Sequence, residues 1–293
     1  MWRLINLTLA GLLLALIFVW REFPDDNLHL IACDVGQGDG LLLIYKDQQI
    51  LVDAGPDDSI LSCLGENMPF WDREIEAAVI THPQTDHMTG MVAVFNSYEV
   101  KQLMVVNFVN DIDQFWVLKE LVLKKNTPVK ELLAGDVLKI GLVELTVLWP
   151  KVPGGNKLAW KETNTDRNVI LGAQTVADPN IFSTVLLGRF GKSKFLLTGD
   201  IDTAIEKQLV SDGVGEVDVL KVAHHGSKYS TSETFLTVVK PKVGIISVGE
   251  KNRFGHPTTE VLQRLAAVGA KIFRTDELGD IKLSSNGEAW MIE

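Results

Sequence analysis

The segment THPQTDHMTG, residues 81–90, concentrates side chains that can bind a metal ion or transfer a proton. His82, Asp86 and His87 fall within six positions, although the whole chain contains only six histidines. The segment directly follows the apolar run AAVI, where a buried strand is expected to end. It is either a polar loop at a strand end or half of a metal site.

Three other apolar runs end in the same kinds of side chain. ILVDAG ends near Asp53, FLLTGD ends at Asp200, and VLKVAHHGS contains His224 and His225. Strand ends beside glycine-rich turns can place several side chains around one ion at the edge of a sheet. Histidine nitrogens and carboxylate oxygens suit zinc, manganese or iron, and the lack of nearby thiols argues against a structural zinc site.

Each of these residues also has an ordinary structural explanation. Asp200 alone would be a helix cap, and Asp53 alone would be a turn residue that holds backbone amides. One of the adjacent histidines at 224 and 225 should point away from any shared ion. The ordered set, more than any single member, therefore favours a metal site.

The elements around these segments predict a layered α/β domain. Helical spacing and capping residues predict helices over 111–125, 201–210, 232–239 and 257–269. Short aliphatic runs between turn signals predict strands, which occur in groups with the helices between them. We therefore expect two sheets with helices outside, in a single domain. Residues 151–180 are rich in turn signals and predict a long loop.

Composition limits the classes of function. The 293 residues are 46% apolar and 23% charged, as in an ordinary globular protein. The net charge of −10 argues against duplex binding by a broad basic surface, although bound metal ions could supply local positive charge to a nucleic-acid substrate. Cys33 and Cys63 are too few for a disulfide framework. We expect both to be buried and unpaired, with a disulfide between them as the minority alternative.

The N-terminal residues predict a membrane helix. The 17 residues from Leu4 to Trp20 carry no charge, which is close to the minimum needed to span a bilayer. A cleaved signal peptide is the alternative, but IFVWREFP offers no small residues at a cut site. We expect an anchor and linker over 1–26, a hydrolase domain over 27–293, and a single-pass membrane protein with its domain outside the cytoplasm.

The ordered motifs resemble the metallo-β-lactamase superfamily, in particular the hydrolase domain of ComEC-type competence proteins. The resemblance covers residues 28–293 almost completely. It rests on CDVGQGDG (33–40), LVDAG (51–55), THPQTDH (81–87), NIFSTVL (180–186), FLLTGD (195–200), LKVAHHGS (220–227), SVGEKNRFGHP (247–257) and RTDELGDIKLSSNG (274–287). This family implies an αββα sandwich of two mixed sheets with outer helices, and one or two divalent metal ions, zinc or manganese, at its rim.

The resemblance also assigns roles to individual residues. The implied metal ligands are His82, Gln84, Asp86, His87, Asp200, His224 and His225. The implied supporting residues are Asp34, Asp39, Asp53, Asn180 and Ser183. Gln84 departs from the family, which has histidine or aspartate there, and a neutral amide binds a transition metal more weakly. The region 180–183 stands where the superfamily has a further histidine. We therefore expect two unequal halves that could share Asp200. The weaker half has His82, and the better half has Asp86, His87 and one of the paired histidines.

Catalysis and substrate binding follow from the same positions. Asp86, or whichever of His224 and His225 does not bind the ion, could orient water or move protons. Three residues beside the paired histidines, Lys221, Ser227 and Ser230, could bind phosphate, and a role as a solvated strand end and loop is the alternative. His256 precedes Pro257 at a helix start, so it is either a cap or a residue at the edge of the site.

Together these features predict a membrane-anchored, metal-dependent hydrolase. We expect a phosphodiesterase or nuclease that acts on DNA, with a possible link to DNA uptake and no protein partner that the sequence identifies. The first alternative is a hydrolase of small esters, lactones or nucleotides on the same scaffold. The second is a non-catalytic domain that tethers a partner at the membrane, which Gln84 favours.

Overall fold

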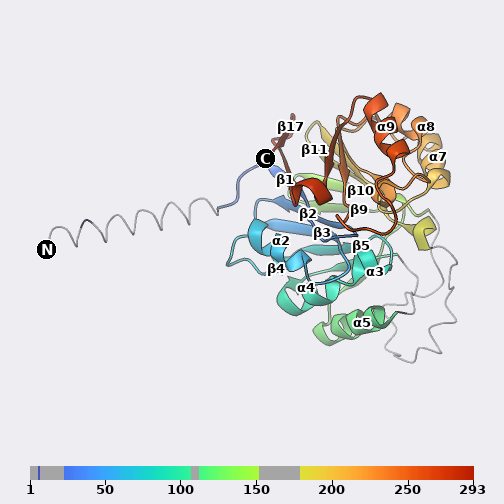
Figure 1. The fold of residues 1–293 in the computed structure, drawn as a ribbon. Coiled ribbons are helices and arrows are strands. Elements are labelled where there is room, and N and C mark those ends of the chain that lie inside the picture. The colour runs from blue at the N-terminus through green and yellow to red at the C-terminus, as the bar shows by residue number, and fades with distance from the viewer. Residues whose placement is uncertain (1–5, 7–22, 107–111, 152–178) are drawn as a thin grey trace.

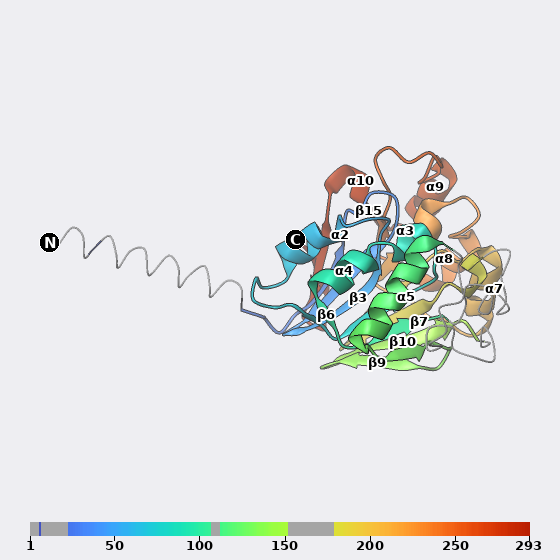
Figure 2. The ribbon, with the colours of Figure 1, turned by 90° about the horizontal axis from the view of Figure 1, so that it is seen from below.

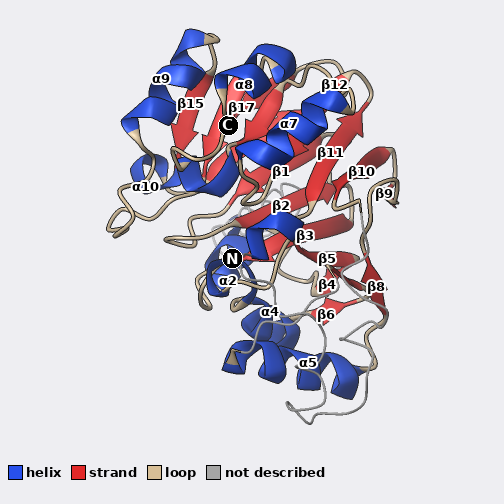
Figure 3. Cartoon of the chain, turned by 90° about the vertical axis from the view of Figure 1, so that its right-hand side faces the viewer, coloured by secondary structure: helices blue, strands red, loops and turns tan. Residues whose placement is uncertain are grey.

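The computed structural model describes residue 6 and residues 23–106, 112–151 and 179–293. Within these residues, two large sheets lie face to face, and helices cover the outer side of each (Figure 1; Figure 3). Both sheets are mixed. The predicted αββα sandwich is therefore confirmed.

The first sheet has eight strands in the order β17-β16-β1-β2-β3-β5-β7-β8. Its middle strands β1, β2 and β3 form an antiparallel meander, and β5, β7 and β8 continue the sheet in parallel with β3. Neighbouring parallel strands end at the same edge of a sheet, so the last residues of β3 and β5 lie side by side at that edge. The strands are Leu28–Ala32 (β1), Gly40–Tyr45 (β2), Gln48–Ala54 (β3), Ala77–Ile80 (β5), Leu103–Val105 (β7), Val129–Glu131 (β8), Ile281–Ser285 (β16) and Trp290–Ile292 (β17).

The second sheet has seven strands in the order β15-β14-β13-β12-β11-β10-β9. Strands β12 to β15 are parallel, so β12 and β13 also end at a common edge. A separate pair joins Glu74–Ile75 (β4) to Glu99–Val100 (β6). The strands are Val137–Ile140 (β9), Val143–Trp149 (β10), Val185–Phe190 (β11), Ser193–Leu197 (β12), Val219–Lys221 (β13), Val243–Ile246 (β14) and Lys271–Arg274 (β15).

The helices form the two outer layers. Ile60–Asn67 (α2), Met91–Ser97 (α4) and Asp113–Lys125 (α5) contribute to the apolar cluster outside the first sheet (Figure 2). Thr203–Ser211 (α7), Glu233–Val239 (α8) and Thr259–Ala267 (α9) do the same outside the second sheet. The short elements are Thr85–Met88 (α3), Thr275–Leu278 (α10), Pro179–Phe182 (η1) and Ala223–Gly226 (η2).

Strand β3 shows how the sequence builds these layers. Its residues Ile50 and Val52 belong to the core between the sheets, whereas Leu51 belongs to the core under the outer helices. This is the two-residue alternation of a strand that is buried on both faces. Such a strand reads as a continuous aliphatic run, and it holds the polar residue at its end, Asp53, at a fixed position.

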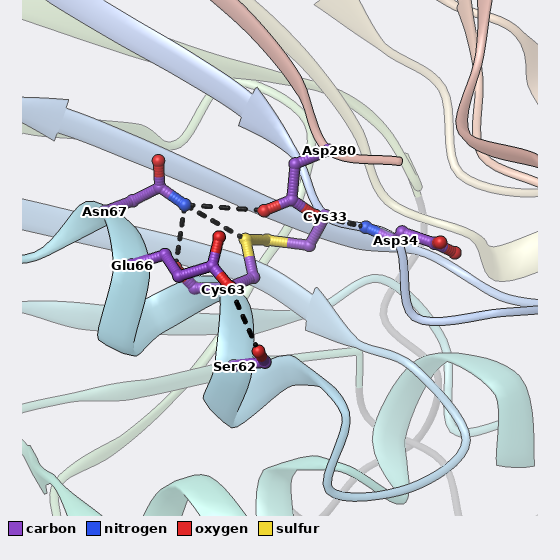
Figure 4. The surroundings of a disulfide bond; sticks show 7 residues. All are labelled: Cys33, Asp34, Ser62, Cys63, Glu66, Asn67 and Asp280. Atoms are coloured by element: carbon purple, nitrogen blue, oxygen red, sulfur yellow. Dashed lines mark hydrogen bonds between the residues drawn. A yellow bond between two sulfur atoms is a disulfide. The ribbon is translucent and has the colours of Figure 1, made fainter. Parts of the chain in front are cut away.

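Cys33 and Cys63 are buried as predicted, but they form a disulfide, so the expectation that they are unpaired is wrong (Figure 4). Cys33 follows β1 and Cys63 lies on α2, and packing of the helix on the sheet brings their Cα atoms to 5.7 Å. This contact between residues 30 positions apart has no local sequence signal. The bond ties the base of loop 34–39 to α2.

Two predicted features lie outside the described residues. The run Leu4–Trp20 has only residue 6 within them, and most of the predicted long loop falls in 152–178. In the part of the chain that the structure describes, no helix is both long and apolar enough to cross a bilayer. The membrane helix and the domain boundary at 26/27 therefore stay predictions.

Candidate metal centre

The four strand ends identified in the sequence meet at one rim of the sandwich. Asp53 is the next-to-last residue of β3, His82 follows β5, Asp200 follows β12, and His225 lies in η2 after β13. The first two come from one sheet and the last two from the other, and α3 adds Asp86 and His87. The site therefore exists only because the two sheets pack together.

Four of the predicted ligands, Asp86, His87, Asp200 and His225, converge on one point. Each offers one ligand atom, and these atoms all lie within 4.8 Å of one another. The Oδ2 atom of Asp200 lies 3.4 Å from Nε2 of His87 and 3.4 Å from Nε2 of His225. Nε2 of His225 also lies 3.6 Å from Oδ2 of Asp86. These are the residues of the half that the sequence predicts to be better furnished.

The cluster fits a divalent metal ion. Nε2 of His87, Nε2 of His225 and Oδ1 of Asp200 are buried and lack a hydrogen-bond partner among the described residues. Buried polar atoms without a partner are costly, so their convergence calls for a ligand. Two imidazole nitrogens and two carboxylates form a donor set that suits zinc or manganese.

Both central histidines are oriented from behind. Nδ1 of His87 lies 2.8 Å from Oδ2 of Asp53, and Nδ1 of His225 lies 2.9 Å from the carbonyl oxygen of Ser247. A carbonyl or carboxylate oxygen only accepts, so each Nδ1 carries the proton and each Nε2 faces the cluster. Such outer hydrogen bonds fix the ring orientation that metal ligands require. Sequence reasoning missed Ser247, because a backbone carbonyl leaves no signal in a sequence.

When no metal is bound, protons on the two central histidines offset the negative charge of the aspartates around them. Burial alone would lower the pKa of His87, but the carboxylates of Asp200 and Asp53 outweigh it and raise this pKa well above its ordinary value. The pKa of His225 is raised in the same way, by Asp200 and Asp39 against burial. A metal ion would take the place of these protons.

Asp53 acts as the predicted support. It has a left-handed backbone, with φ of 58°, and its carboxylate accepts hydrogen bonds from the backbone N–H of Thr81 at 2.8 Å and from the Thr81 hydroxyl at 2.7 Å. It therefore joins the ends of β3 and β5 while it orients His87. Thr81 is a second supporting residue that sequence reasoning did not identify.

Asp39 and Lys221 form a buried ion pair behind the cluster, with 2.7 Å between Lys221 Nζ and Asp39 Oδ2. Burial opposes the charge on Asp39, but Lys221 outweighs this and holds the pKa of Asp39 well below its ordinary value. The Asp39 N–H also donates to the carbonyl oxygen of Asp86 at 3.1 Å. Gly38 permits this approach, since a Cβ there would lie 2.2 Å from the same oxygen. Asp39, Asp53 and His87 could form a second metal group. However, Asp39 is paired with Lys221, and Asp53 is hydrogen-bonded to Thr81 and His87, so the two aspartates are better described as supports of the cluster.

The three residues predicted to contact phosphate are buried. The exposed fractions of Lys221, Ser227 and Ser230 contradict the alternative of a solvated loop, and the phosphate contacts stay a prediction. Lys221 is committed to Asp39, and the Ser230 hydroxyl donates to the carbonyl oxygens of Ala223 and Ser227. The sequence places these residues correctly beside the histidines, but it does not show that their side chains point inward. Asp34, in contrast, is exposed and holds the turn at Gly36 through a 3.1 Å hydrogen bond.

The other half of the site, which the sequence predicts, would be built from His82 and its neighbours. Burial, together with the adjacent His87, lowers the pKa of His82 to about 3, so this imidazole is neutral. Its Nδ1 contacts the hydroxyls of Thr81 at 3.1 Å and Ser183 at 3.4 Å, and its Nε2 is buried without a hydrogen-bond partner among the described residues. Gln84, half-buried, precedes α3. Asn180 lies in η1, and its carbonyl accepts from the Ser183 N–H.

The paired histidines separate clearly. His225 is buried and belongs to the cluster, whereas His224 is partly exposed, with its Nε2 at 3.8 Å from Oδ2 of Asp200. Both have left-handed backbones, with φ of 51° and 53°, and the planes of their rings are 82° apart. His224 packs against His256, with 5.8 Å between ring centroids. His256 is therefore at the edge of the site.

Comparisons with known proteins agree with this fold and identify the family. Residues 33–250 match the family described as the metallo-beta-lactamase superfamily. ComE operon protein 3 of Bacillus subtilis is 30% identical over 85% of this chain and 32% of its own length. Recombination protein 2 of Haemophilus influenzae is 28% identical over 92% of this chain and 30% of its own length. Competence protein ComA of Neisseria gonorrhoeae is 40% identical over 36% of this chain and 16% of its own length. The chain spans a third or less of these three relatives.

Solved structures show the same fold. The metallo-beta-lactamase fold protein YhfI of Bacillus subtilis superposes with a TM-score of 0.55 at 13% identity, over 88% of this chain and all of that chain. Tm1679, described as a metal-dependent hydrolase, gives a TM-score of 0.52 at 12% identity, over 84% of this chain and 95% of that chain. At these identities the likeness extends to the fold alone.

Proposed function

Because the chain belongs to the metallo-β-lactamase superfamily, we propose that its His/Asp cluster binds a divalent metal ion, zinc or manganese, and hydrolyses phosphodiester bonds in DNA. The observation that carries the proposal is the convergence of Asp86, His87, Asp200 and His225 on one buried point. Several ligand atoms of the cluster are buried without a hydrogen-bond partner among the described residues, and a bound ion would supply that partner.

The residues of the cluster and its edge would have different roles in hydrolysis. When bound, a divalent ion lowers the pKa of water and offsets negative charge on a phosphoryl group. His87 and His225 are held rigidly by their Nδ1 hydrogen bonds, so they position the ion. Asp86 is more exposed than the other three cluster residues, which suits it to orient the attacking water and accept its proton. His224 is also accessible and can donate a proton to the leaving oxygen.

Exposed aromatic and cationic side chains near the histidine edge support a nucleic-acid substrate. Phe254 is exposed and stacks on His256 with 5.9 Å between ring centroids, and Arg253 lies over the Phe254 ring at 5.5 Å. Tyr229, close in sequence to the paired histidines, is also exposed, and Lys228 Nζ lies 5.1 Å from its ring centroid. Aromatic faces stack on bases and cations contact phosphates. A small ester or lactone would need neither.

The test is an assay panel on the whole chain with added manganese or zinc. The substrates are single-stranded DNA, duplex DNA, a chromogenic phosphodiester, an ester and a lactone. We expect DNA cleavage that Asp86→Asn abolishes and that Phe254→Ala weakens through KM. The matched control is Phe70→Ala, which alters an equally exposed ring next to α2. Hydrolysis of the ester or lactone alone would support the small-molecule alternative. No hydrolysis, with metal binding unaffected by Asp86→Asn, would support the tethering domain.

We also propose that the run Leu4–Trp20 anchors the domain outside the cytoplasm, and that the domain acts in DNA uptake. Competence in the name of one relative supports the second point. The buried Cys33–Cys63 disulfide supports the first, because such bonds persist mainly in oxidising compartments. The whole chain should sediment with membranes, and protease added to cells with opened outer layers should reach the domain. Recovery of the intact chain in the soluble fraction would contradict the anchor.

A further inference from the structure

Three exposed aromatic rings gather at one end of the first sheet. Phe23 is 61% exposed, Phe70 is 62% exposed and Trp71 is 46% exposed. Their rings are in contact, with 6.0 Å between the centroids of Phe23 and Trp71 and 4.7 Å between those of Phe70 and Trp71. Phe23 is the first residue described after the N-terminal run, and the other two follow α2 in the sequence. These three residues form the aromatic patch. Single exposed apolar residues are ordinary, but a contiguous group marks a contact surface.

The sequence indicates what covers the aromatic patch. The uncharged run ends at Trp20, three residues before Phe23. An extended chain advances about 3.3–3.6 Å per residue, so Phe23 lies within about 10 Å of the end of the run. The headgroup region on each side of a bilayer is about 5–8 Å thick. The aromatic patch is therefore within reach of that region, where tryptophan and other amphipathic rings concentrate.

Polar contacts fix the place where the chain enters the domain. His29 Nε2 lies 2.9 Å from Oδ1 of Asp25, and its Nδ1 lies 3.3 Å from Oε1 of Glu293. Lys46 Nζ lies 3.0 Å from Oδ1 of Asp26. Asp25 and Asp26 are thus paired with β1 and with the turn after β2, and His29 is also paired with Glu293. These contacts hold residues 25 and 26, which follow Phe23 closely, against the domain.

We propose that the aromatic patch inserts into the interfacial region of the bilayer and sets the orientation of the domain. This inference rests on the anchor proposed above. The anchor alone would fix distance but leave the domain free to rotate, whereas a second contact beside it fixes one face toward the lipid.

This orientation holds the metal centre away from the membrane. Asp72 directly follows the aromatic patch, and its Oδ2 accepts a 3.0 Å hydrogen bond from the side chain of Gln49, near the start of β3. Asp53, which supports the metal cluster, lies near the opposite end of the same strand. A strand advances about 3.3 Å per residue, so Gln49 and Asp53, four residues apart, are separated by about 13 Å along β3. The rim that carries the cluster therefore faces the aqueous phase.

The test uses the whole chain in vesicles of phosphatidylcholine and phosphatidylglycerol. Benzoylphenylalanine, a photoreactive ring, is placed at Phe70 in one variant and at Tyr229 in another. Tyr229 is 68% exposed, so it is a matched aromatic position, and it follows η2, which carries His225, by three residues. After irradiation, mass spectrometry measures the lipid adduct. We expect a several-fold higher yield at position 70 than at position 229.

The outcomes separate the two proposals. If the chain does not float with vesicles, the anchor fails and the inference fails with it. If it floats but the lipid adducts at positions 70 and 229 are equal or absent, only the inference is overturned. Crosslinks from position 70 to a second copy of the chain instead of lipid would overturn it in favour of a self-association surface. Flotation of F70S/W71S with an increased adduct at position 229 would support it independently.

Discussion

The two halves of the metal centre differ in charge and in how firmly their side chains are held. One half gathers two carboxylates and two histidines, whose Nε2 atoms lie within 4 Å of an aspartate oxygen. The other offers His82, held through Nδ1 by two hydroxyl groups, and the neutral Gln84. The first should bind an ion firmly, and the second should bind one weakly or only with substrate. Ligand identity and outer hydrogen bonds together therefore make one chain's two half-sites unequal.

Asp200→Asn should have the largest effect, because Asp200 lies at the centre of the first half. The substitution keeps the shape of the side chain and removes the charge that faces His87 and His225. We expect metal affinity and hydrolysis to fall at least about 100-fold, with the fold intact. Calorimetric titration measures the metal affinity, and circular dichroism checks that the fold is intact. Asp202→Asn is the matched control, because asparagine caps α7 as well as aspartate does. Equal effects of both substitutions would contradict the assignment.

Asp53→Asn should come next, since it acts on the first half through His87. The amide cannot accept from Thr81 and His87 as the carboxylate does, so we expect about 10–100-fold weaker metal binding. Thermal unfolding should also show a loss of about 1–3 kcal/mol. Ser183→Ala is the corresponding change behind His82. It should weaken the second ion more than the first, since the Ser183 hydroxyl also accepts a 2.9 Å hydrogen bond from the Asp200 N–H. If Ser183→Ala weakens the first ion as much as Asp53→Asn does, the halves are not separate.

The residues that the sequence located correctly are those at strand ends. A buried strand such as β3 fixes its own direction, so the position of Asp53, and likewise of Asp200, follows from an aliphatic run and the turn after it. The sequence did not decide between His224 and His225, because the choice depends on two left-handed residues in η2. The sequence predicts no helix over Thr85–Met88, where the short helix α3 carries Asp86 and His87.

Contacts between distant segments were the least predictable. Lys221 and Ser230 lie next to the histidines in sequence and were expected to meet substrate. The direction of their side chains is set by packing. Lys221 ends β13 of the second sheet, and packing of the two sheets brings it to Asp39, which precedes β2 of the first sheet. The Cys33–Cys63 bond depends in the same way on how α2 packs against the end of β1. Local patterns identify which residues are polar and near the rim, but not which way each one points.

The pH dependence of metal binding should also separate the halves. The raised pKa values of His87 and His225 mean that, without metal, these rings stay protonated near neutral pH. Their contribution to stability is fully present below the unfolded pKa, about 6.5, and is lost as pH rises through the raised pKa. A metal ion must displace these protons, so its affinity should rise by up to about tenfold per pH unit for each proton.

Melting temperatures with and without zinc at pH 6 and pH 8 measure this effect. The increase on adding zinc should be larger at pH 8. His82 is neutral at both pH values because burial and His87 lower its pKa to about 3. His82→Ala should therefore leave the pH dependence of the tightly bound ion unchanged. A zinc-induced shift that is the same at both pH values would contradict the protonated state of His87 and His225.

Gln84→Asp should give the smallest change, and it acts on the second half alone. Gln84 lies two residues after His82 and directly before α3, so a carboxylate there would place a charged oxygen beside the neutral imidazole. We expect the affinity for the second ion to rise about tenfold, which corresponds to about 1.4 kcal/mol, while the first ion is unaffected. Thr85→Asp is the control, since it adds the same charge at an exposed neighbouring position. If Thr85→Asp strengthens the second ion equally, the gain is general attraction and Gln84 is not a ligand position. Two equally tight ions in the unaltered chain, measured by titration and elemental analysis, would show that the amide already serves as well as a carboxylate and that the two halves are equivalent.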